Sequence, residues 1–270
     1  MIQTAPANFS ITSQLAEALT KYRNIAAFLG LVGLGTCVAG WVMDPTQFFR
    51  SYLVGYFFWF GISVGSLALL MVQHLTGGAW GMVIRRILEA GSRTLPYMAI
   101  LFIPILFGVP NLYEWDDATK VAHDVILQKK ALYLNAPFWI ARVVIYFVIW
   151  NLLMYLLNKW SKQEDTEGGF KHAINMEKLS APGIVIYVFT ITFAVTDWVM
   201  SLTPHWFSTI FGFMTAVGEG LSTFAFSIAV LALLMSVPPM SQVVTKKHLH
   251  DLGKLMFAFV MLWAYMNFSQ

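Results

Sequence analysis

Three ionisable side chains lie within long apolar stretches of this sequence. Arg142, Asp197 and Glu219 are the acidic or basic residues found away from the ends of those stretches. An ionised group in a membrane is costly unless a partner, water or a function offsets the cost. We estimate that Arg142 lies roughly 10 Å and Asp197 about 7 Å from the same end of their predicted helices. The sequence therefore predicts a buried ion pair that locks two helices together, or a pair that in addition exchanges protons or binds a ligand.

Glu219 is the most isolated of the three groups. It falls about eleven residues into its stretch, which is roughly 16 Å from the same surface and near the middle of a bilayer. It has no obvious charge partner, and Gly218 and Gly220 flank it. Two interpretations stay open: a carboxyl group that exchanges protons, or a protonated carboxyl that hydrogen-bonds a neighbouring helix.

The cysteine and the histidines argue against a redox metal in this chain. Cys37 is the single cysteine and lies in the first apolar stretch, so we expect no internal disulfide, no Fe–S cluster and no Cys-rich zinc site. A membrane haem b would need axial histidines at similar depth on facing helices. The six histidines instead fall at the ends of the apolar stretches or between them: His74, His123, His172, His205, His248 and His250. We therefore expect no metal and no cofactor bound by this chain itself.

The composition indicates that lipid is part of the solvent. Of 270 residues, 58% are hydrophobic and 11% are charged, whereas a soluble domain carries about a quarter charged residues. A membrane span needs roughly 20 apolar residues. Stretches near that length recur at about residues 24–43, 51–73, 95–112, 135–157, 182–202, 207–237 and 254–270. They lack the alternation of β-barrel strands, so the sequence predicts an all-α, polytopic transmembrane helix bundle of about seven helices over residues 24–270, after an N-terminal tail of residues 1–23.

Glycines and prolines in these stretches are interpreted as packing features. Gly55, Gly61 and Gly65 form a row that permits close approach of another helix. Pro104 and Pro110 are expected to bend or end the third helix. The aromatic residues, which make up 16% of the chain, are for the most part belt and packing residues.

The lysines and arginines are shared unequally between the two ends of the predicted bundle. The end that includes the N-terminal tail carries twelve: Lys21, Arg23, Arg85, Arg86, Arg93, Lys159, Lys162, Lys171, Lys178, Lys246, Lys247 and Lys254. The other end carries four: Arg50, Lys120, Lys129 and Lys130. Cytoplasmic loops are enriched in these residues, so the N-terminus is expected to be cytoplasmic. They lie in short loops without a basic stripe, which argues against nucleic-acid binding.

Several motifs resemble those of a known family. Ser51–Gly55, Phe58–Gly61, His74–Gly81 and Arg85–Ala90 resemble the F subunit of alternative complex III, a bacterial quinol:cytochrome c oxidoreductase. Thr196–Leu202, His205–Thr209, Leu252–Leu255, Trp263–Tyr265 and Phe268–Gln270 resemble motifs shared by its F and C subunits. The resemblance, to NrfD-like, polysulfide-reductase-type membrane subunits, covers about residue 50 to the end. Related chains continue into further helices, so this chain is expected to be truncated at its C-terminus.

The resemblance implies a multi-pass subunit of the bacterial inner membrane that is not catalytic alone. Its partners would be the lipid bilayer, a sister NrfD-like membrane subunit, and periplasmic Fe–S and multihaem cytochrome c subunits. Those partners would hold the haem c and the Fe–S clusters, with quinol or quinone at or near the complex. The F type would support assembly and proton conduction. The expected proton route or buried polar cluster is Glu219, Asp197, Arg142 and His74, and the expected periplasmic-side motif is His205, Trp198 and Trp206.

Three alternatives stay open. The chain could be a quinone-binding, C-type subunit. It could be an ion or solute transporter unrelated to electron transfer, although no paired halves with matching broken helices are seen. It could also be a purely structural membrane anchor, if Arg142 and Asp197 only pair and Glu219 stays protonated.

The first prediction concerns orientation. We expect the N-terminus and the loop Asn158–Ser180 to be cytoplasmic and the loop Tyr113–Leu134 to be periplasmic. In a Cys37→Ser background, a membrane-impermeant thiol reagent added to intact cells should label a cysteine placed at Lys120 but not one placed at Lys171. The reverse labelling pattern would reject this orientation.

Overall fold

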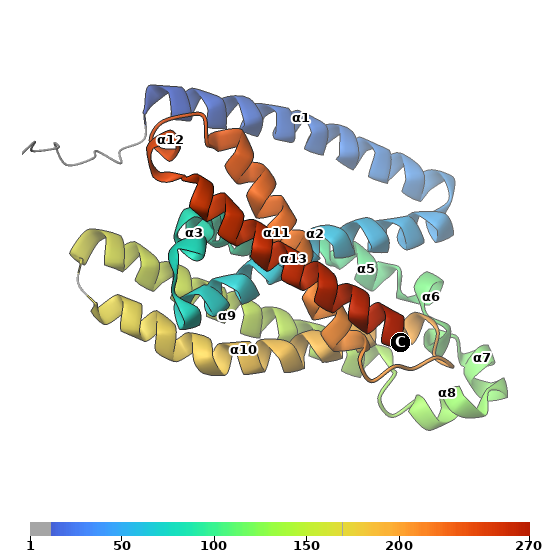
Figure 1. Cartoon of the computed structure of the whole chain (residues 1–270). Coiled ribbons are helices and arrows are strands. Elements are labelled where there is room, and N and C mark those ends of the chain that lie inside the picture. Colours follow the sequence, from blue (N-terminus) through green and yellow to red (C-terminus); the bar gives the residue numbers. More distant parts are fainter. Residues whose placement is uncertain (1–11, 169) are drawn as a thin grey trace, which may run out of the picture.

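The computed structural model describes residues 12–168 and 170–270, which form an all-α helix bundle without β-strands (Figure 1). Seven helical segments of the described residues are long and apolar enough to cross a membrane: Ser13–Met43, Pro45–Thr76, Ala79–Phe107, Ala136–Glu167, Lys171–Leu202, Phe211–Leu234 and Lys246–Ser269. This confirms the predicted fold class. The chain is a multi-pass membrane protein.

Five of the spans are single helices, and two contain breaks. The single helices are α1 (Ser13–Met43), α2 (Pro45–Thr76), α9 (Ala136–Glu167), α11 (Phe211–Leu234) and α13 (Lys246–Ser269). The third span is divided into α3 (Ala79–Ser92), α4 (Leu95–Leu101) and α5 (Ile103–Phe107), and α10 (Lys171–Trp198) is extended by the 3-10 helix η2 (Met200–Leu202). The shorter connecting helices are α6 (Val109–Leu112), η1 (Glu114–Asp116), α7 (Ala118–His123), α8 (Val125–Lys130) and α12 (Met240–Val243).

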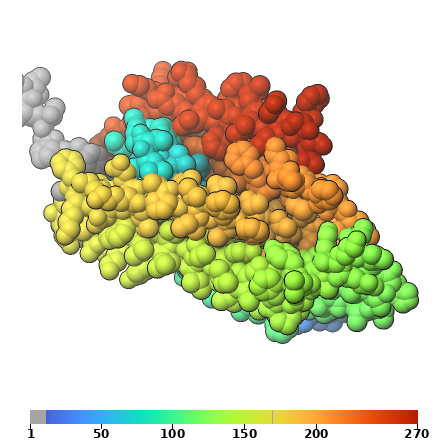
Figure 2. Space-filling model, turned by 90° about the horizontal axis from the view of Figure 1, so that it is seen from below, coloured from blue at the N-terminus to red at the C-terminus, as the bar shows by residue number. Residues whose placement is uncertain are grey.

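Successive spans run in opposite directions, so their connections gather at two ends of the bundle. We call the end that holds the α2–α3, α9–α10 and α11–α13 connections the basic end, and it lies to the left in Figure 1. The other end, to the right, holds the α1–α2 connection and residues 108–135, and we call it the loop end. In Figure 2 the green segment around α7 and α8 projects at this end, beside the orange segment that follows α10.

Short polar residues, prolines and a glycine mark several helix ends. The Asp44 carboxylate accepts a hydrogen bond from the backbone N–H three residues later, and Pro45 is the first residue of α2. Asn135 caps α9 in the same way, with Pro137 in its first turn. Proline at this position loses no hydrogen bond, because the first N–H groups of a helix have no partner within it. Helix α2 ends at Gly77, whose φ of 63° favours glycine.

Helix α2 forms the centre of the bundle. In its most apolar window 67% of the residues are buried, whereas no residue is buried in that of α1. Around α2 lies an aromatic core whose members include Phe60, Phe102, Trp150 and Trp198. Helix α1 stands apart from the rest (Figure 1), and the Thr12 hydroxyl donates a hydrogen bond to the Pro238 carbonyl at 2.8 Å.

Some helix boundaries differ from the expected ones. The third span begins at Ala79 rather than near residue 95, so Arg85 and Arg86 lie on a helix and not in a loop. The charged residues of α3 lower the mean hydropathy of this segment, so it does not look like part of a span. The structure pairs these charges with one another and with side chains of α9. The expected tail, residues 1–23, is helical from Ser13, and its residues 1–11 lie outside those described. Within the loop expected at Asn158–Ser180, residues 158–167 and 171–180 are helical, and residue 169 lies outside those described.

The glycine row on α2 allows α11 to approach closely, although only two of its three members take part. A Cβ atom at Gly65 would lie 2.8 Å from the backbone oxygen of Glu219, and one at Gly61 would lie 3.3 Å from the Glu219 side chain. A Cβ atom at Gly55 would meet nothing within 4 Å. Helices α2 and α11 therefore pack backbone to backbone where Glu219 lies.

The second prediction follows from this packing. Gly65→Val should destabilise the protein by about 1–3 kcal/mol, the usual cost of overpacking, because the new side chain must push α11 away. Gly55→Val is the matched control on the same helix and should change stability by less than about 0.5 kcal/mol. Unfolding in mild detergent against increasing sodium dodecyl sulfate measures both. Equal effects of the two substitutions would contradict the close approach.

Candidate functional site: buried charges in the bundle

Arg142 on α9 and Asp197 on α10 form the ion pair that the sequence predicted. Arg142 Nε donates to Asp197 Oδ2 at 2.7 Å, and Nη2 donates to Oδ1 at 3.0 Å. The Tyr146 hydroxyl donates to the same Oδ2 at 2.8 Å. The Asp197 side chain is fully buried, and that of Arg142 is 8% exposed. A bidentate pair with an additional donor satisfies the buried carboxylate on both oxygens.

The rest of the guanidinium group is also occupied. Nη1 donates to the Tyr133 carbonyl at 3.0 Å, and the group lies over the Tyr133 ring at 3.9 Å and the Phe138 ring at 4.4 Å. Burial, together with the nearby Asp197 carboxylate, raises the pKa of the Tyr133 phenol to about 12. This phenol therefore stays neutral at physiological pH and adds no charge beside the Arg142–Asp197 pair.

The same cluster attaches the loop end to the helices. The backbone oxygen of Asp197 accepts hydrogen bonds from the Trp139 indole at 2.9 Å and the Ser201 hydroxyl at 2.6 Å. The Tyr113 hydroxyl donates to the Trp198 carbonyl at 2.9 Å. This hydrogen bond attaches the segment of residues 108–135 to the end of α10. Trp198 itself is fully buried in the aromatic core, so it acts in packing.

Two other residues of the expected periplasmic-side motif lie at the surface of the loop end. His205 Nε2 lies 2.7 Å from Asp124 Oδ2, and the Lys130 ammonium donates to the Pro204 carbonyl at 2.5 Å. Trp206 is 43% exposed and meets Phe211 edge to face. These contacts hold the turn after η2 against α7 and α8 without bringing His205 to the Asp197 carboxylate.

Glu219 lies apart from the Asp197 cluster. The residue is 5% exposed, and Oε2 accepts a hydrogen bond from the Tyr187 hydroxyl of α10 at 2.8 Å. Oε1 is buried and has no partner among the described residues. Tyr187 precedes Asp197 by ten residues on α10, which is roughly 15 Å along a helix. The structure thus shows the neighbouring-helix hydrogen bond that was one interpretation of Glu219, and it leaves one carboxyl oxygen free.

A cleft reaches Glu219 from the side of the bundle. It has a volume of about 460 Å³ and lies between α2, α11 and α13. Its lining is mainly apolar and aromatic, and includes Phe57, Phe58, Trp263 and Asn267 besides Glu219. One carboxyl group, one amide and the hydroxyl residues Thr215 and Ser222 in an otherwise apolar wall suit an amphipathic molecule or lipid better than a polar solute.

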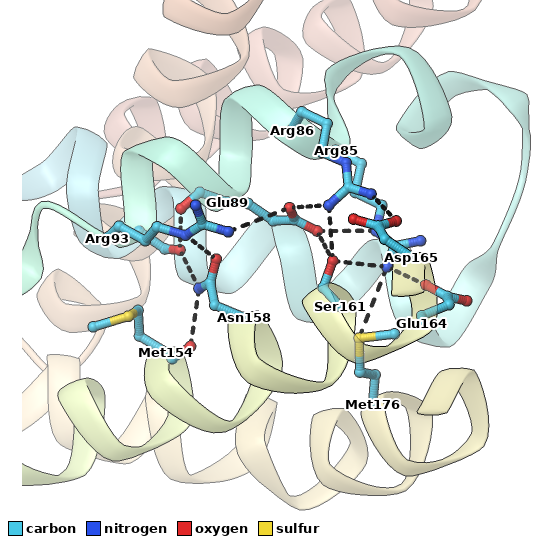
Figure 3. A network of polar contacts seen from close by, with 11 residues as sticks. Arg85, Arg86, Glu89, Arg93, Met154, Asn158, Ser161, Glu164, Asp165 and Met176 are labelled. Carbon is cyan, nitrogen blue, oxygen red and sulfur yellow. Dashed lines mark hydrogen bonds and ion pairs between the residues drawn. The ribbon is translucent and has the colours of Figure 1, made fainter. Parts of the chain in front are cut away.

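A second charged cluster lies at the basic end, centred on Glu89 of α3 (Figure 3). Its carboxylate is 2% exposed and pairs with Arg85 at 3.1 Å and Arg86 at 2.7 Å. The Ser161 hydroxyl of α9 donates to it at 2.6 Å. On the α9 side, Glu164 pairs with Arg85 at 2.5 Å, and Asp165 pairs with Arg86. Further along α3, the Arg93 guanidinium donates to the Asn158 amide oxygen at 2.7 Å.

The sequence identified Arg85–Ala90 as a motif but did not identify Glu89 as a buried group. Arg85, Glu89 and Arg93 recur every four residues, which places them on one face of a helix. That spacing would have predicted an internally paired face if the helix had been expected to begin at Ala79. What no pattern could show is that Ser161 and Glu164 of α9 complete the cluster.

His74 belongs to this end of the bundle. It lies in the last turn of α2, and its Nε2 is buried without a partner among the described residues. The structure therefore places His74 at the basic end, the end that holds the Glu89 cluster, and not beside Arg142 and Asp197. In the described part of the chain no three His, Cys, Asp or Glu side chains are placed to hold a metal ion.

The third prediction tests the ion pair. Arg142→Met or Asp197→Leu alone should destabilise the bundle by about 3–5 kcal/mol, because each leaves the other charge buried and unpaired. The double variant should cost less than either single change, and Tyr146→Phe reports what the phenol contributes by itself. Unfolding of the purified protein in detergent measures all four. Single variants with wild-type stability, or costs that simply add in the double variant, would show that the pair is not coupled.

No protein-family model and no curated protein matches this chain. Its function is therefore inferred from the chemistry of the three buried sites. Asp197 and Glu89 are saturated by cations and hydroxyl donors. Glu219 is the buried carboxyl group that pairs with no cation among the described residues.

Proposed function

We propose that this chain is a membrane subunit, without a redox metal of its own, of a bacterial quinol:cytochrome c oxidoreductase of the alternative complex III type. The support is the resemblance of its motifs to those of that family, together with the place of those motifs in the bundle. Thr196–Leu202 contains Asp197 and Ser201 of the Asp197 cluster at the loop end. Arg85–Ala90 contains the core of the Glu89 cluster. These two motifs thus coincide with polar contacts that join the helices.

In this proposal the chain has two roles. The Arg142–Asp197 pair and the Glu89 cluster hold α3, α9 and α10 together and give partner subunits a rigid surface, which is the assembly role. Glu219 exchanges protons during quinol oxidation. The observation that carries the second role is a carboxyl group with one oxygen bonded to Tyr187 and the other buried without a partner. Such a group can change its protonation without breaking an ion pair.

The proposal also places the chain in the inner membrane with its N-terminus in the cytoplasm. The basic end of the bundle is then cytoplasmic and the loop end periplasmic. Periplasmic Fe–S and multihaem cytochrome c subunits would contact the loop end, and a sister NrfD-like subunit would lie beside the bundle. Purification in mild detergent tests this assignment, because co-purifying chains with a haem c spectrum support it and a haem-free preparation contradicts it.

A second candidate function is quinone binding by this chain itself, as in a C-type subunit. The cleft of about 460 Å³ beside Glu219 favours it, because its apolar and aromatic lining suits a quinone ring and its isoprenoid tail. A photoreactive quinone analogue should then label residues of this cleft such as Trp263. Labelling confined to a partner subunit would leave Glu219 with the proton role alone.

The fourth prediction concerns Glu219 in the assembled complex. Glu219→Gln keeps the size of the side chain and its bond to Tyr187 but removes titration. We expect normal assembly and a rate of quinol oxidation, with its coupled proton release, reduced by about a hundredfold or more, the usual scale for loss of a positioned proton-transfer group. Quinol oxidation and proton release are measured with the purified complex in vesicles. Glu177→Gln, the same change at an exposed site on α10, is the control and should behave as wild type.

Wild-type proton release in Glu219→Gln would make Glu219 a structural residue. Loss of assembly in this variant, with Tyr187→Phe giving the same loss, would assign the carboxyl group to helix packing. The amount of complex recovered from the membrane distinguishes these two results, because it is normal in the first and reduced in the second.

A further inference from the structure

A row of hydroxyl side chains on α11 leads from Glu219 towards the basic end. Thr223 and Ser227 follow Glu219 at intervals of four residues, so all three side chains share one face of the helix. Thr223 is fully buried and Ser227 is 1% exposed. Ser227 Oγ has no hydrogen-bond partner among the described residues. Buried polar atoms without a protein partner commonly bind water.

This row meets a second row on α2. The Thr223 hydroxyl donates to the backbone oxygen of Ile62 at 3.4 Å, and the Ser66 hydroxyl donates to the same oxygen at 2.6 Å. Gly65 lets the two helices approach here, because any side chain at that position would collide with Thr223. Hydroxyl groups from α11 and α2 therefore converge on a single carbonyl group inside the bundle.

Ser66 leads on to the Glu89 cluster. Its side chain fills the space beside Gly91 of α3, where a Cβ atom would otherwise lie. The next residue, Ser92, donates to the Glu89 backbone oxygen at 2.9 Å and accepts a hydrogen bond from Asn158 at 3.2 Å. Gln73 and His74, further along α2, contribute a buried oxygen and a buried ring nitrogen without partners among the described residues. Polar groups therefore continue from Glu219 to the basic end.

The opposite direction offers Glu219 a less suitable partner. The nearest buried acid towards the loop end is Asp197, and both of its oxygens accept hydrogen bonds from Arg142, with Tyr146 as a third donor. Protonating Asp197 would break a bidentate pair and leave a buried arginine unpaired, which is strongly unfavourable.

From this arrangement we propose that Glu219 exchanges protons with water at the basic end of the bundle, through Thr223 and Ser66 and the water bound beside Ser227. This inference deepens the proton role proposed for Glu219 and identifies its route, whatever complex the chain belongs to. Thr223 and Ser66 are relay residues in it, and the Glu89 cluster is the entrance.

The relay conserves protons at every step. A hydronium ion at the Glu89 cluster gives up a proton and remains as water. Each hydroxyl group turns from the Ile62 carbonyl, accepts one proton and passes its own onward through bound water, and the Glu219 carboxylate gains one at Oε1. Each hydroxyl can act in this way because it has one donor hydrogen and two acceptor lone pairs. Release of the proton from Glu219 follows the same atoms in reverse, and the route itself needs no oxidant or reductant.

The fifth prediction compares two threonines placed symmetrically about Glu219. Thr223 lies four residues towards the basic end and Thr215 four residues towards the loop end, where its hydroxyl bonds the Phe211 carbonyl at 2.9 Å. We expect Thr223→Val to slow hydrogen–deuterium exchange of the Glu219 carboxyl group about tenfold, since one lost hydrogen bond is worth about that factor in rate. Thr215→Val should leave the exchange unchanged. Thr223→Ser, which keeps the hydroxyl group, should restore the wild-type rate.

Infrared difference spectroscopy of the purified protein transferred to D₂O measures this exchange. The Glu219 band is the carboxyl C=O band that disappears in Glu219→Gln. A slower exchange in Thr215→Val but not in Thr223→Val would overturn the proposal, and so would equal rates in all variants. Absence of a protonated carboxyl band assigned to Glu219 would also overturn it. Ser227→Ala, the milder change, should slow exchange too and covers the case in which Thr223→Val does not fold.

Proton flux into vesicles gives an independent readout. With a potassium diffusion gradient as the driving force, Thr223→Val and Glu219→Gln should both lower the flux relative to Thr215→Val. Neither measurement needs quinol or a partner subunit. If the chain proves to belong to another complex while Thr223→Val slows exchange, the proposed function fails and the route stands. If the chain belongs to the proposed complex but Thr223→Val does not slow the exchange, the proposed function stands and the route is rejected.

Discussion

A positive and a negative charge buried together determine how the loop end of this bundle is built. Arg142 and Asp197 would each be too costly inside a membrane alone, and they are tolerated because two parallel hydrogen bonds join them. Around this pair the Asp197 carbonyl binds Trp139 and Ser201. These bonds fix α9 and α10, with the η2 segment that follows α10, in one position along each other's length. The aromatic core packs beside them.

The same physical rule acts at the basic end with more groups. Glu89 is buried and pairs with Arg85 and Arg86. From α9, Ser161 donates a hydrogen bond to Glu89, and Glu164 and Asp165 pair with the two arginines. Three arginines of the third span and three carboxylates then balance in charge. Clusters of this kind specify which helices are neighbours, because removing Arg85, Arg86 or Ser161 takes a partner from the buried Glu89 carboxylate.

Glu219 departs from this rule, and that departure makes it the functional candidate. It has a neutral donor, Tyr187, where the other buried acids have cations. Glycines on α2 bring the α2 backbone against it, and a cleft reaches it from the side. A protonation change here disturbs one hydrogen bond, whereas the same change at Asp197 or Glu89 would disturb several helix contacts. The proposed proton exchange and the contacts that join the helices thereby involve different carboxyl groups of one bundle.

The sequence by itself determined that there are seven spans, the unusual status of Arg142, Asp197 and Glu219, and the break beside Pro104 in the third span, because hydropathy and backbone chemistry are local properties. It could also place Arg142 and Asp197 at similar depth, since helix rise is constant. It did not predict the break between α3 and α4. It did not find the burial of Glu89, because the charged turns of α3 look like a loop until α9 covers them. Likewise, Tyr187 as the partner of Glu219, and the meeting of Thr223 with Ser66 at Ile62, depend on which faces of distant helices touch. Those contacts are set by packing among the helices, which no single stretch of sequence encodes.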